Sequence, residues 1–519
     1  MATDVTARPV SAPTATPTRQ ARGPVLLMAL VGGLVGAAGI AVAHRALIDD
    51  AYITLAYARQ LAEHLHWGLI PTEESNAATS PLNVALLAAA TRLVALVTGE
   101  IRPVVGLGVL TVVLSALLTG WAASLSRRLG ASAGWALVVL AVVLANPFVN
   151  SSLGMEVLLT ATLLVGLTRA AVHGRVAGFG VLAGLLVLTR VDLGVIVAVV
   201  FLLSPQVRRW GAVAVAAVVA LPWFVFSWWH FGSAIPDSFV IKTLQGSFGE
   251  ATFANGLWEQ WAPQSSFAVW LAVAPALLGV LLVLGMLVAG ACRRLPRERW
   301  PLVGLGLGGV AYFAAYSALG VPPYQWYYVP STVSLGVAGV LALAAPTARW
   351  RPAGARPAPI TRLIPALLTV AMVALGVSVL PGSWVDWERP TFFGNWALPQ
   401  QYVAIGADVG RIVGDATVEA PPEIGTLAYA CECSMVDEFS DRGRTLELVQ
   451  ARIDEAGTVG QALLLANFTR LDRDQAPRPA EYRLVYSYDA APPGVPSWPV
   501  SSPATGDAVL YLEPLPTAR

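Results

Sequence analysis

The chain has 519 residues, of which 56% are hydrophobic and only 13% charged, and its mean hydropathy is +0.63. A soluble domain carries about a quarter charged residues, so this composition predicts a polytopic membrane protein. The formal net charge of +1 is not concentrated in a basic domain, which excludes nucleic acid as a partner.

Residues 1–24 are rich in Pro, Thr, Ala and Arg and are expected to form a disordered cytoplasmic N-terminus. The next stretch is uncharged and reaches the roughly 20 residues that a membrane-spanning helix needs. Ten further apolar segments predict eleven spans within a transmembrane domain of residues 25–381. The spans are 25–44, 103–126, 132–149, 155–172, 176–189, 193–207, 211–230, 266–291, 301–319, 327–346 and 363–381.

The arginines set the orientation of these spans. Arginine clusters at 127–128, 208–209, 293–299 and 349–362 fall on one side of the membrane, whereas acidic residues fill the alternate loops. Because cytoplasmic loops carry the excess of positive charge, the N-terminus is predicted inside and the C-terminal domain outside, in a multi-pass protein of the plasma membrane.

Two apolar segments need separate treatment. Counting residues 81–98 as a span would place Arg127 outside, so we expect an interfacial or re-entrant helix within a first outer loop of residues 49–102. Residues 176–189 are short and end in Thr189-Arg190-Val191-Asp192. Such a break at membrane depth is tolerated where it lines a polar cavity.

Residues 382–519 carry no spanning segment and are expected to form an extracytoplasmic mixed α/β domain. The runs 462–466, 482–486 and 508–512 predict strands, and 442–444 a loop before a helix at 446–449. Cys431 and Cys433 lack the further ligands of a zinc site. A disulfide between them would close a very tight ring, and both redox states remain open.

Asp49-Asp50 stands directly after the first span, where charged groups are costly unless they have a role. One interpretation is a catalytic pair at the membrane surface. The other is structural, with Asp49 as N-cap and first-turn acid of a helix through Ala51 towards His64.

Further short polar elements fall on the predicted outer face. Each has a structural alternative: Arg190 and Asp192 neutralise each other, Glu156 is a first-turn acid, and the lone lysine Lys242 snorkels. Tyr327 and its neighbours then belong to an interfacial aromatic belt. The elements are Asp49–Tyr52, Asn76–Asn83, Asn150–Glu156, Thr189–Asp192, Phe231–Lys242 and Pro322–Tyr328.

The order of these motifs, DDAY, GME, TRxD, PDSFxxK, QWYY and PEIGTLAY followed by Val436-Asp437, resembles that of actinobacterial GT-C glycosyltransferases. It is most similar to the terminal arabinofuranosyltransferases of the mycobacterial cell wall, and it covers residues 45–445. The resemblance implies a mostly α, GT-C-like bundle that transfers arabinofuranose, or a hexose such as mannose, with inversion. The donor is a polyprenyl-phosphate sugar and the acceptor a cell-envelope glycan or glycolipid at the outer face.

The resemblance also implies residue roles. Asp49 or Asp50 is the general base, with Asp49 favoured because it comes first after the span. Charge on the leaving phosphate must be held by cations or hydrogen-bond donors. The donor-binding residues are Lys242, Arg190, Gln325, Tyr327 and Tyr328, and the substrate-binding residues are Tyr52, Thr79, Ser80, Glu156, Asp192 and Asp237. The scheme requires no metal or cofactor, and we expect a monomer.

Two other functions are compatible with the composition. A transporter or flippase of lipid-linked sugars would show related halves and polar groups across the membrane, and neither is found in the sequence. An inactive scaffold that binds cell-wall polymer could lose the aspartate pair, which this chain retains.

Overall fold

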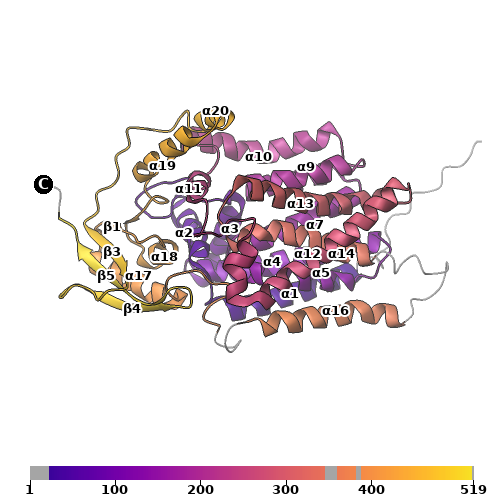
Figure 1. Ribbon diagram of the computed structural model, residues 1–519, viewed down its shortest axis with the longest axis horizontal. Coiled ribbons are helices and arrows are strands. Elements are labelled where there is room, and N and C mark those ends of the chain that lie inside the picture. Colours follow the sequence, from indigo (N-terminus) through magenta and orange to yellow (C-terminus); the bar gives the residue numbers. More distant parts are fainter. Residues whose placement is uncertain (1–22, 345–358, 381–386, 517–519) are drawn as a thin grey trace, which may run out of the picture.

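The computed structural model describes residues 23–344, 359–380 and 387–516. It consists of a bundle of long helices with a domain of helices and strands at one end (Figure 1). Most of the predicted N-terminal segment 1–24 and the basic residues 349–356 lie outside the described residues. The mostly α architecture with a C-terminal mixed α/β domain is confirmed.

Each of the eleven predicted spans contains a helix. They are α1 (Gly23–Ala43), α4 (Pro103–Arg128), α5 (Trp135–Leu144), α7 (Val157–Val172), α8 (Val176–Thr189), α9 (Gly194–Leu203), α10 (Trp210–His230), α12 (Ala262–Ala291), α13 (Trp300–Leu319), α14 (Val329–Ala344) and α16 (Pro359–Ser378). In the described part of the chain, seven helical segments are long and apolar enough to cross a membrane, and five apolar helices are shorter. The protein is therefore a multi-pass membrane protein.

Close packing of α1 on α4 depends on small residues. Gly32 and Gly36 are buried one turn apart on α1. A Cβ at Gly32 would lie 2.2 Å from Oγ1 of Thr119, and one at Gly36 would lie 2.6 Å from Oγ of Ser115. Spacing small residues four apart lets two helix backbones approach, as in other membrane bundles. The first span is thereby fixed, and with it the position of the acidic pair that follows.

Further helices and turns connect these spans. They are α2 (Asp49–His64), α3 (Pro81–Thr98), α6 (Pro147–Asn150), α11 (Asp237–Gln245) and the turns η2 (Val191–Leu193), η3 (Leu257–Trp261) and η5 (Gln325–Tyr328); the turn η4 (Arg297–Arg299) precedes α13. The segment 81–98 is helical, as expected, and starts with Pro81 after the cap Ser80. It is also long and apolar enough to cross a membrane, so its interfacial placement stays a prediction.

The C-terminal domain is built on one mixed sheet of order β2-β1-β3-β5-β4. Strand β1 pairs in parallel with β2 and β3, whereas β5 runs antiparallel to both β3 and β4. Its elements are α17 (Pro399–Val413), β1 (Val418–Glu419), α18 (Gly425–Cys431), β2 (Met435–Val436), α19 (Arg442–Glu455), α20 (Thr458–Asn467), β3 (Tyr482–Ser487), β4 (Ser497–Ser502) and β5 (Gly506–Pro514). Its core joins inward side chains of the sheet, such as Leu484 and Leu510, to Tyr402 and Ile405 of α17.

Two secondary-structure predictions in this domain are wrong. The run 462–466 is helical in α20, because Leu464 packs inward while its neighbours face outward, a helical and not an alternating pattern. Residues 442–444 form the first turn of α19, which Asp441 caps by accepting a hydrogen bond from the N–H of Gly443 at 2.9 Å. The strands predicted at 482–486 and 508–512 are confirmed as β3 and β5.

Candidate functional site

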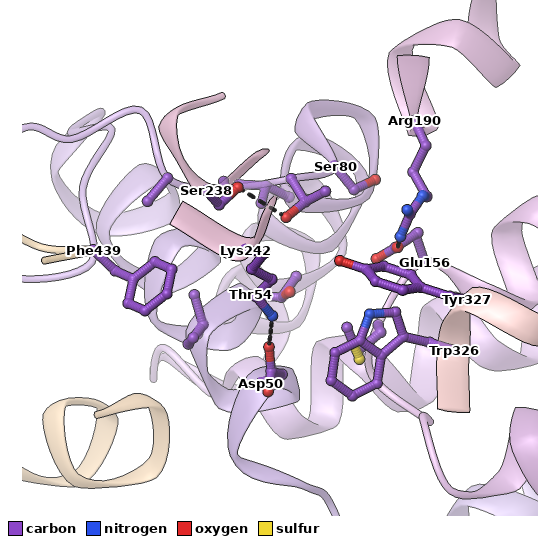
Figure 2. Close-up of a pocket in the computed structure, with 16 residues that line it drawn as sticks. Asp50, Thr54, Ser80, Glu156, Arg190, Ser238, Lys242, Trp326, Tyr327 and Phe439 are labelled. Carbon is purple, nitrogen blue, oxygen red and sulfur yellow. Dashed lines mark hydrogen bonds and ion pairs between the residues drawn. The ribbon is translucent and has the colours of Figure 1, made fainter. Parts of the chain in front are cut away.

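Two cavities meet where the bundle faces the C-terminal domain. The smaller has a volume of about 40 Å³ and extends towards Glu156 and Arg190 (Figure 2). The larger has a volume of about 390 Å³ and borders the C-terminal domain at Trp396 and Glu423. Both are lined by Asp50, Ile53, Lys242, Trp326 and Phe439.

An ion pair stands at the junction of the two cavities. Nζ of Lys242, on α11, donates to Oδ1 of Asp50, on α2, at 2.6 Å. The ammonium also lies 4.5 Å from the ring centroid of Tyr324 and 4.9 Å from that of Trp326. Burial alone would lower the pKa of Lys242, but the charge and hydrogen bond of Asp50, together with Tyr324 and Tyr327, outweigh burial and raise the pKa, so the lysine is charged at neutral pH. Asp50 retains 23% side-chain exposure and is open to the cavities.

The second cation of the site, Arg190, lies at the break between α8 and η2. Its guanidinium donates to Glu156 at 2.9 Å, to Asp192 at 2.8 Å and to the hydroxyl of Tyr316 at 2.7 Å. It also lies 4.9 Å from the ring centroid of Tyr327. The neutralising pair that the sequence offered as a structural alternative is therefore present. Arg190, Glu156 and Tyr327 nevertheless line the smaller cavity, so the arginine of this pair reaches the site while Asp192 holds it from outside.

Asp49 and Asp50 have different partners. The two carboxylate oxygens of Asp49 accept the backbone N–H groups of Gly425 at 2.9 Å and Thr426 at 2.7 Å, at the start of α18. A Cβ at Gly425 would lie 2.1 Å from the carbonyl oxygen of Asp49, so the contact requires glycine. Burial raises the pKa of Asp49 to about 6. Asp49 thus fixes a helix N-terminus of the C-terminal domain, although it also borders the larger cavity.

Beside Asp49, Glu423 lines the larger cavity and organises its wall. The Glu423 carboxylate accepts hydrogen bonds from Nδ2 of Asn395 at 2.9 Å, from the N–H of Trp396 at 2.8 Å and from the hydroxyl of Tyr402 at 2.7 Å. Burial, and then the charge of Asp49, raise the pKa of Glu423 to about 8. The carboxyl groups of Asp49 and Glu423 therefore interact electrostatically, and this interaction links the start of α2 to the loop that carries Trp396.

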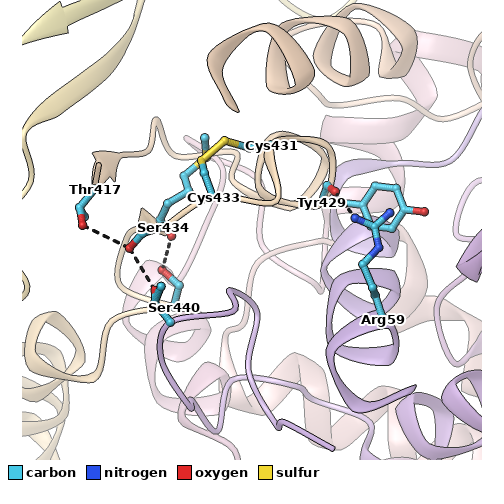
Figure 3. Close-up of a disulfide and its surroundings, with 9 residues drawn as sticks. Arg59, Thr417, Tyr429, Cys431, Cys433, Ser434 and Ser440 are labelled. Atoms are coloured by element: carbon cyan, nitrogen blue, oxygen red, sulfur yellow. Dashed lines mark hydrogen bonds between the residues drawn. A yellow bond between two sulfur atoms is a disulfide. The ribbon is translucent and has the colours of Figure 1, made fainter. Parts of the chain in front are cut away.

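A disulfide closes the far end of α18. Cys431, the last residue of this helix, is bonded to Cys433 (Figure 3), so the pair that the sequence left open is oxidised here. On the same helix, the carbonyl of Tyr429 accepts a hydrogen bond from Arg59 of α2 at 2.9 Å. The Arg59 guanidinium also lies 4.1 Å from the centroid of the Tyr429 ring. Helix α18 is thus held against α2 along its length.

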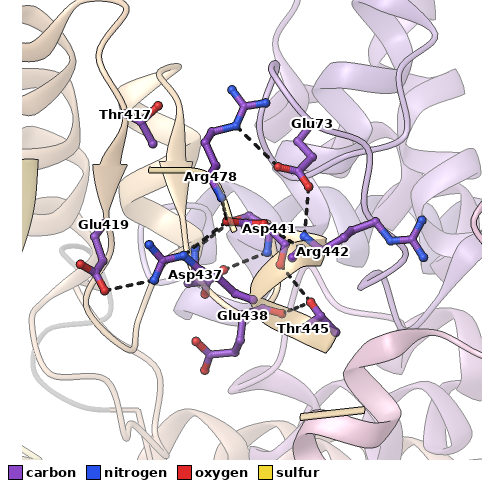
Figure 4. Close-up of polar contacts among 12 residues, drawn as sticks. Glu73, Thr417, Glu419, Asp437, Glu438, Asp441, Arg442, Thr445 and Arg478 are labelled. Carbon is purple, nitrogen blue, oxygen red and sulfur yellow. Dashed lines mark hydrogen bonds and ion pairs between the residues drawn. The ribbon is translucent and has the colours of Figure 1, made fainter. Parts of the chain in front are cut away.

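A polar network ties the first outer loop to the C-terminal domain at a second place (Figure 4). Glu73 accepts hydrogen bonds from the N–H of Arg442 and from Nε2 of Gln475, both at 3.0 Å, and pairs with Arg478 at 3.7 Å. Asp441 accepts the N–H of Arg478 at 2.8 Å. These bonds and those of Asp49 hold the domain over the cavities.

Most of the predicted site residues meet at the cavities. Those that line them are Asp49, Asp50, Thr79, Ser80, Glu156, Arg190, Lys242, Gln325 and Tyr327. Four others do not line either cavity. Tyr52 packs on Tyr429, with ring centroids 5.1 Å apart, and Tyr328 donates a hydrogen bond to the carbonyl of Phe253. Asp237 accepts a hydrogen bond from Ser233, and Asp192 accepts one from Arg190. The donor-binding role of Tyr328 and the substrate-binding roles of the other three stay predictions.

Several lining residues were not predicted. Ser238 stands within the PDSF motif and Glu423 within the PEIG motif, so a position was available but no role had been assigned. Asn395, Trp396 and Gln260 carry no local signal because the fold alone brings them to the larger cavity. Among the described residues, no group of three or more His, Cys, Asp or Glu side chains is placed to hold a metal ion.

Comparisons with known proteins extend these observations. No protein-family model matches the chain, and no curated protein matches its sequence. Solved structures do match. ArnT from Cupriavidus metallidurans, bound to undecaprenyl phosphate, has a TM-score of 0.54 at 14% identity, over 94% of this chain and 97% of ArnT. The Archaeoglobus fulgidus oligosaccharyltransferase has a TM-score of 0.53 at 11% identity, over 88% of this chain and 69% of that enzyme.

These likenesses identify the fold as that of the GT-C membrane glycosyltransferases, and the predicted GT-C fold is confirmed. The mycobacterial arabinofuranosyltransferase AftD is also similar, with a TM-score of 0.48 at 13% identity over 93% of this chain and 41% of AftD. A likeness of that size carries no argument about the sugar.

Proposed function

We propose that the protein is a glycosyltransferase that moves a sugar from a polyprenyl-phosphate donor to an acceptor hydroxyl at the outer face of the membrane. The observation that carries the proposal is the Asp50–Lys242 pair, which is shared by both cavities. One cavity can then hold the phosphate end of the donor and the other the acceptor, with a carboxylate and an ammonium between them. The GT-C fold supports this reading.

In this proposal the smaller cavity receives the donor phosphate. Lys242 and Arg190 are the two cations that line it, and Ser80, Ser238 and Tyr327 add hydroxyl donors. As the bond between the anomeric carbon and the phosphate oxygen breaks, the phosphodiester becomes a monoester and gains negative charge. Preorganised cations and hydroxyl groups stabilise that charge most in the transition state. The undecaprenyl phosphate bound to ArnT supports a donor of this class.

Asp50 is the general base of this scheme. The acceptor hydroxyl attacks the anomeric carbon from the side opposite the phosphate and passes its proton to the Asp50 carboxylate, so the configuration inverts. Lys242 donates a hydrogen bond to Oδ1 of Asp50. A donor phosphate that draws the ammonium towards itself would leave Asp50 free to accept the proton. Asp49, whose two oxygens are taken by α18, orients the acceptor cavity.

The larger cavity suits the acceptor. Trp261, Trp326 and Trp396 offer flat aromatic faces, and Gln260 and Asn395 offer amide groups, a combination that matches the two sides of a sugar ring. We assign to it a cell-envelope glycan or glycolipid. Arabinofuranose and a hexose such as mannose remain the two candidate sugars for transfer, and the enzyme acts as a monomer in the plasma membrane.

The test compares Asp50→Asn with Asp49→Asn in liposomes supplied with a polyprenyl-phosphate sugar and a glycan acceptor. We expect Asp50→Asn to lose transfer by about 10²–10⁴-fold, the usual contribution of a general base, with a moderate fall in melting temperature, because the amide oxygen still accepts from Lys242 but no longer offsets its charge. Asp49→Asn should lower the melting temperature, because an amide accepts only one of the two N–H groups of α18, while part of the transfer remains. Full transfer by Asp50→Asn would refute its role as base.

A further inference from the structure

Helix α20 of the C-terminal domain presents an apolar face to its surroundings. Val459, Ala462, Leu463 and Ala466 recur at the spacing of one helix face, and all four are exposed. Val459 is 75% exposed and Leu463 68%. The opposite side of the helix supplies Leu464, which packs on a small core with Val449, Ile453, Phe468 and Val240 of α11. No residue of α20 is fully buried. An exposed apolar face of this kind is typical of a surface that contacts an apolar partner.

This helix is fixed at the end of α10, one of the helices long enough to cross the membrane. Oδ1 of Asn467 accepts the N–H groups of Ala234 at 3.0 Å and Ile235 at 2.9 Å, in the loop that follows α10. Nε1 of Trp228, in the last turn of α10, donates to the carbonyl of Ala466 at 3.2 Å. Figure 1 shows α20 beside this end of α10, at the edge of the bundle.

The surface next to α20 has the character of a membrane boundary. Along α10, Val218, Leu221, Val225 and Phe226 are between 47% and 73% exposed, as expected of side chains that face lipid. Trp229, 66% exposed, marks the level at which amphipathic rings gather. The guanidinium of Arg470, three residues after α20, lies 3.8 Å from the centroid of the Trp229 ring. The apolar face of α20 is thus continuous with the lipid-facing side of α10.

We propose that α20 lies in the surface of the lipid bilayer, with Val459, Ala462, Leu463 and Ala466 in the boundary between headgroups and acyl chains. A helix with an apolar face of this kind, flanked by Trp and Arg, is typical of an interfacial anchor. The Trp229 ring and the Arg470 cation then stand at headgroup level, where a phosphate is within reach of the guanidinium. The contact would hold the C-terminal domain against the membrane beside the cavities, independently of which sugar is transferred.

The proposal is tested with a fluorophore that reports its own surroundings. In the Cys292→Ser background, Leu463→Cys is labelled with a small polarity-sensitive dye. The protein is reconstituted in vesicles of phosphatidylcholine and phosphatidylglycerol, with or without acyl chains brominated near the headgroup. Pro516→Cys is the matched control, because it is exposed and lies two residues after β5, which Figure 1 shows on the side of the C-terminal domain away from the bundle.

We expect brominated lipid to remove most of the emission at position 463 and little at position 516, whereas iodide in the water should quench position 516 several-fold more. A melting temperature equal to that of the Cys292→Ser parent confirms that the labelled chain is folded. Iodide quenching at 463 equal to that at 516, without quenching by lipid, would place α20 in water and overturn the proposal. Shielding of position 463 from both quenchers would also overturn it, because a protein surface would then cover α20.

Discussion

At the scale of single residues, the surroundings of Lys242 separate a phosphate ligand from a snorkelling side chain. A snorkelling lysine extends its ammonium into water along apolar surface. Lys242 instead keeps 15% of its side chain exposed, between Asp50 and the rings of Tyr324 and Trp326. Its charge is therefore held in the site before any ligand arrives.

Replacing this charge should weaken the use of the donor more than that of the acceptor. We expect Lys242→Ala to raise the KM for the polyprenyl-phosphate sugar and lower kcat/KM by about 10²-fold, and Lys242→Arg to recover part of it, since guanidinium and ammonium differ in geometry. Arg59→Ala is the matched control: its side chain is also 15% exposed, ion-paired and stacked on a tyrosine, but outside the cavities. Steady-state kinetics at varied donor concentration measure these changes. An equal effect of Lys242→Ala and Arg59→Ala would contradict the role of Lys242 as a ligand of the donor phosphate.

The sequence placed both carboxylates at the end of the first span in the site and favoured Asp49 as the base, whereas both oxygens of Asp49 are taken by α18 and Asp50 is the one open to both cavities. Neighbours on a helix point about 100° apart, so Asp49 and Asp50 cannot both face the same partner. What separates them is Gly425, whose N–H binds Asp49 from 376 positions away in the sequence. No local pattern contains that information. The same holds for Asn395 and Trp396, which reach the larger cavity only because the C-terminal domain folds over it.

At the scale of elements, the break between α8 and η2 is stabilised by charges that satisfy one another. Arg190 is 6% exposed and is surrounded by Glu156, Asp192 and Tyr316. Tyr312 also donates to Asp192, at 2.7 Å. The sequence predicted this break from the short apolar run and the charged residues after it. It could not show that two tyrosines of α13 complete the network.

We therefore expect Asp192 to act mainly through structure. Asp192→Ala leaves Arg190 with fewer partners in a buried place, which typically costs about 3–5 kcal/mol. Thermal unfolding in detergent should show a clear fall in melting temperature, with Tyr312→Phe causing a smaller one in the same direction. A variant that keeps the parent's melting temperature but has a raised KM would instead support the substrate-binding role predicted from the sequence.

Helix α20 shows why a short apolar run misleads. Ala-Leu-Leu-Leu-Ala fits a buried strand and one turn of a helix equally well, because five residues do not distinguish the two periods. The runs at β3 and β5 contain β-branched or aromatic residues at Val485, Tyr486, Val509 and Tyr511, and these were predicted correctly. The residue types in these short runs therefore distinguished strand from helix where the length of the run did not.

At the scale of the whole molecule, the junction of the two domains should respond to pH through Glu423. Its pKa of about 8 in the folded protein lies above the usual 4.5, so folding favours the protonated carboxyl. The stabilisation is complete below the usual pKa and is lost as the pH rises through about 8. We expect the melting temperature to fall between about pH 5 and pH 8 and to level off above, and Glu423→Gln to flatten that fall.

A matched control for this pH dependence is Glu419→Gln in the same domain. Arg483 and Arg444 outweigh the effect of burial and lower the pKa of Glu419, so its titration lies on the acidic side. Its substitution should leave the fall in melting temperature between about pH 5 and pH 8 unchanged. A fall that persists in full over this range in Glu423→Gln would show that another group causes it.

The predicted orientation of the whole chain rests on the alternation of arginine-rich and acidic loops, and the thiols can test it. Cys431 and Cys433 are disulfide-bonded, which suits the oxidising side of a membrane, whereas Cys292 is free and exposed beside Arg293 and Arg294. We predict that a membrane-impermeant maleimide labels Cys292 only after cells are permeabilised. Pro516→Cys, in the C-terminal domain, should be labelled in intact cells. Labelling of Cys292 in intact cells, with Pro516→Cys protected, would reverse the topology and move the proposed transfer reaction to the cytoplasmic face.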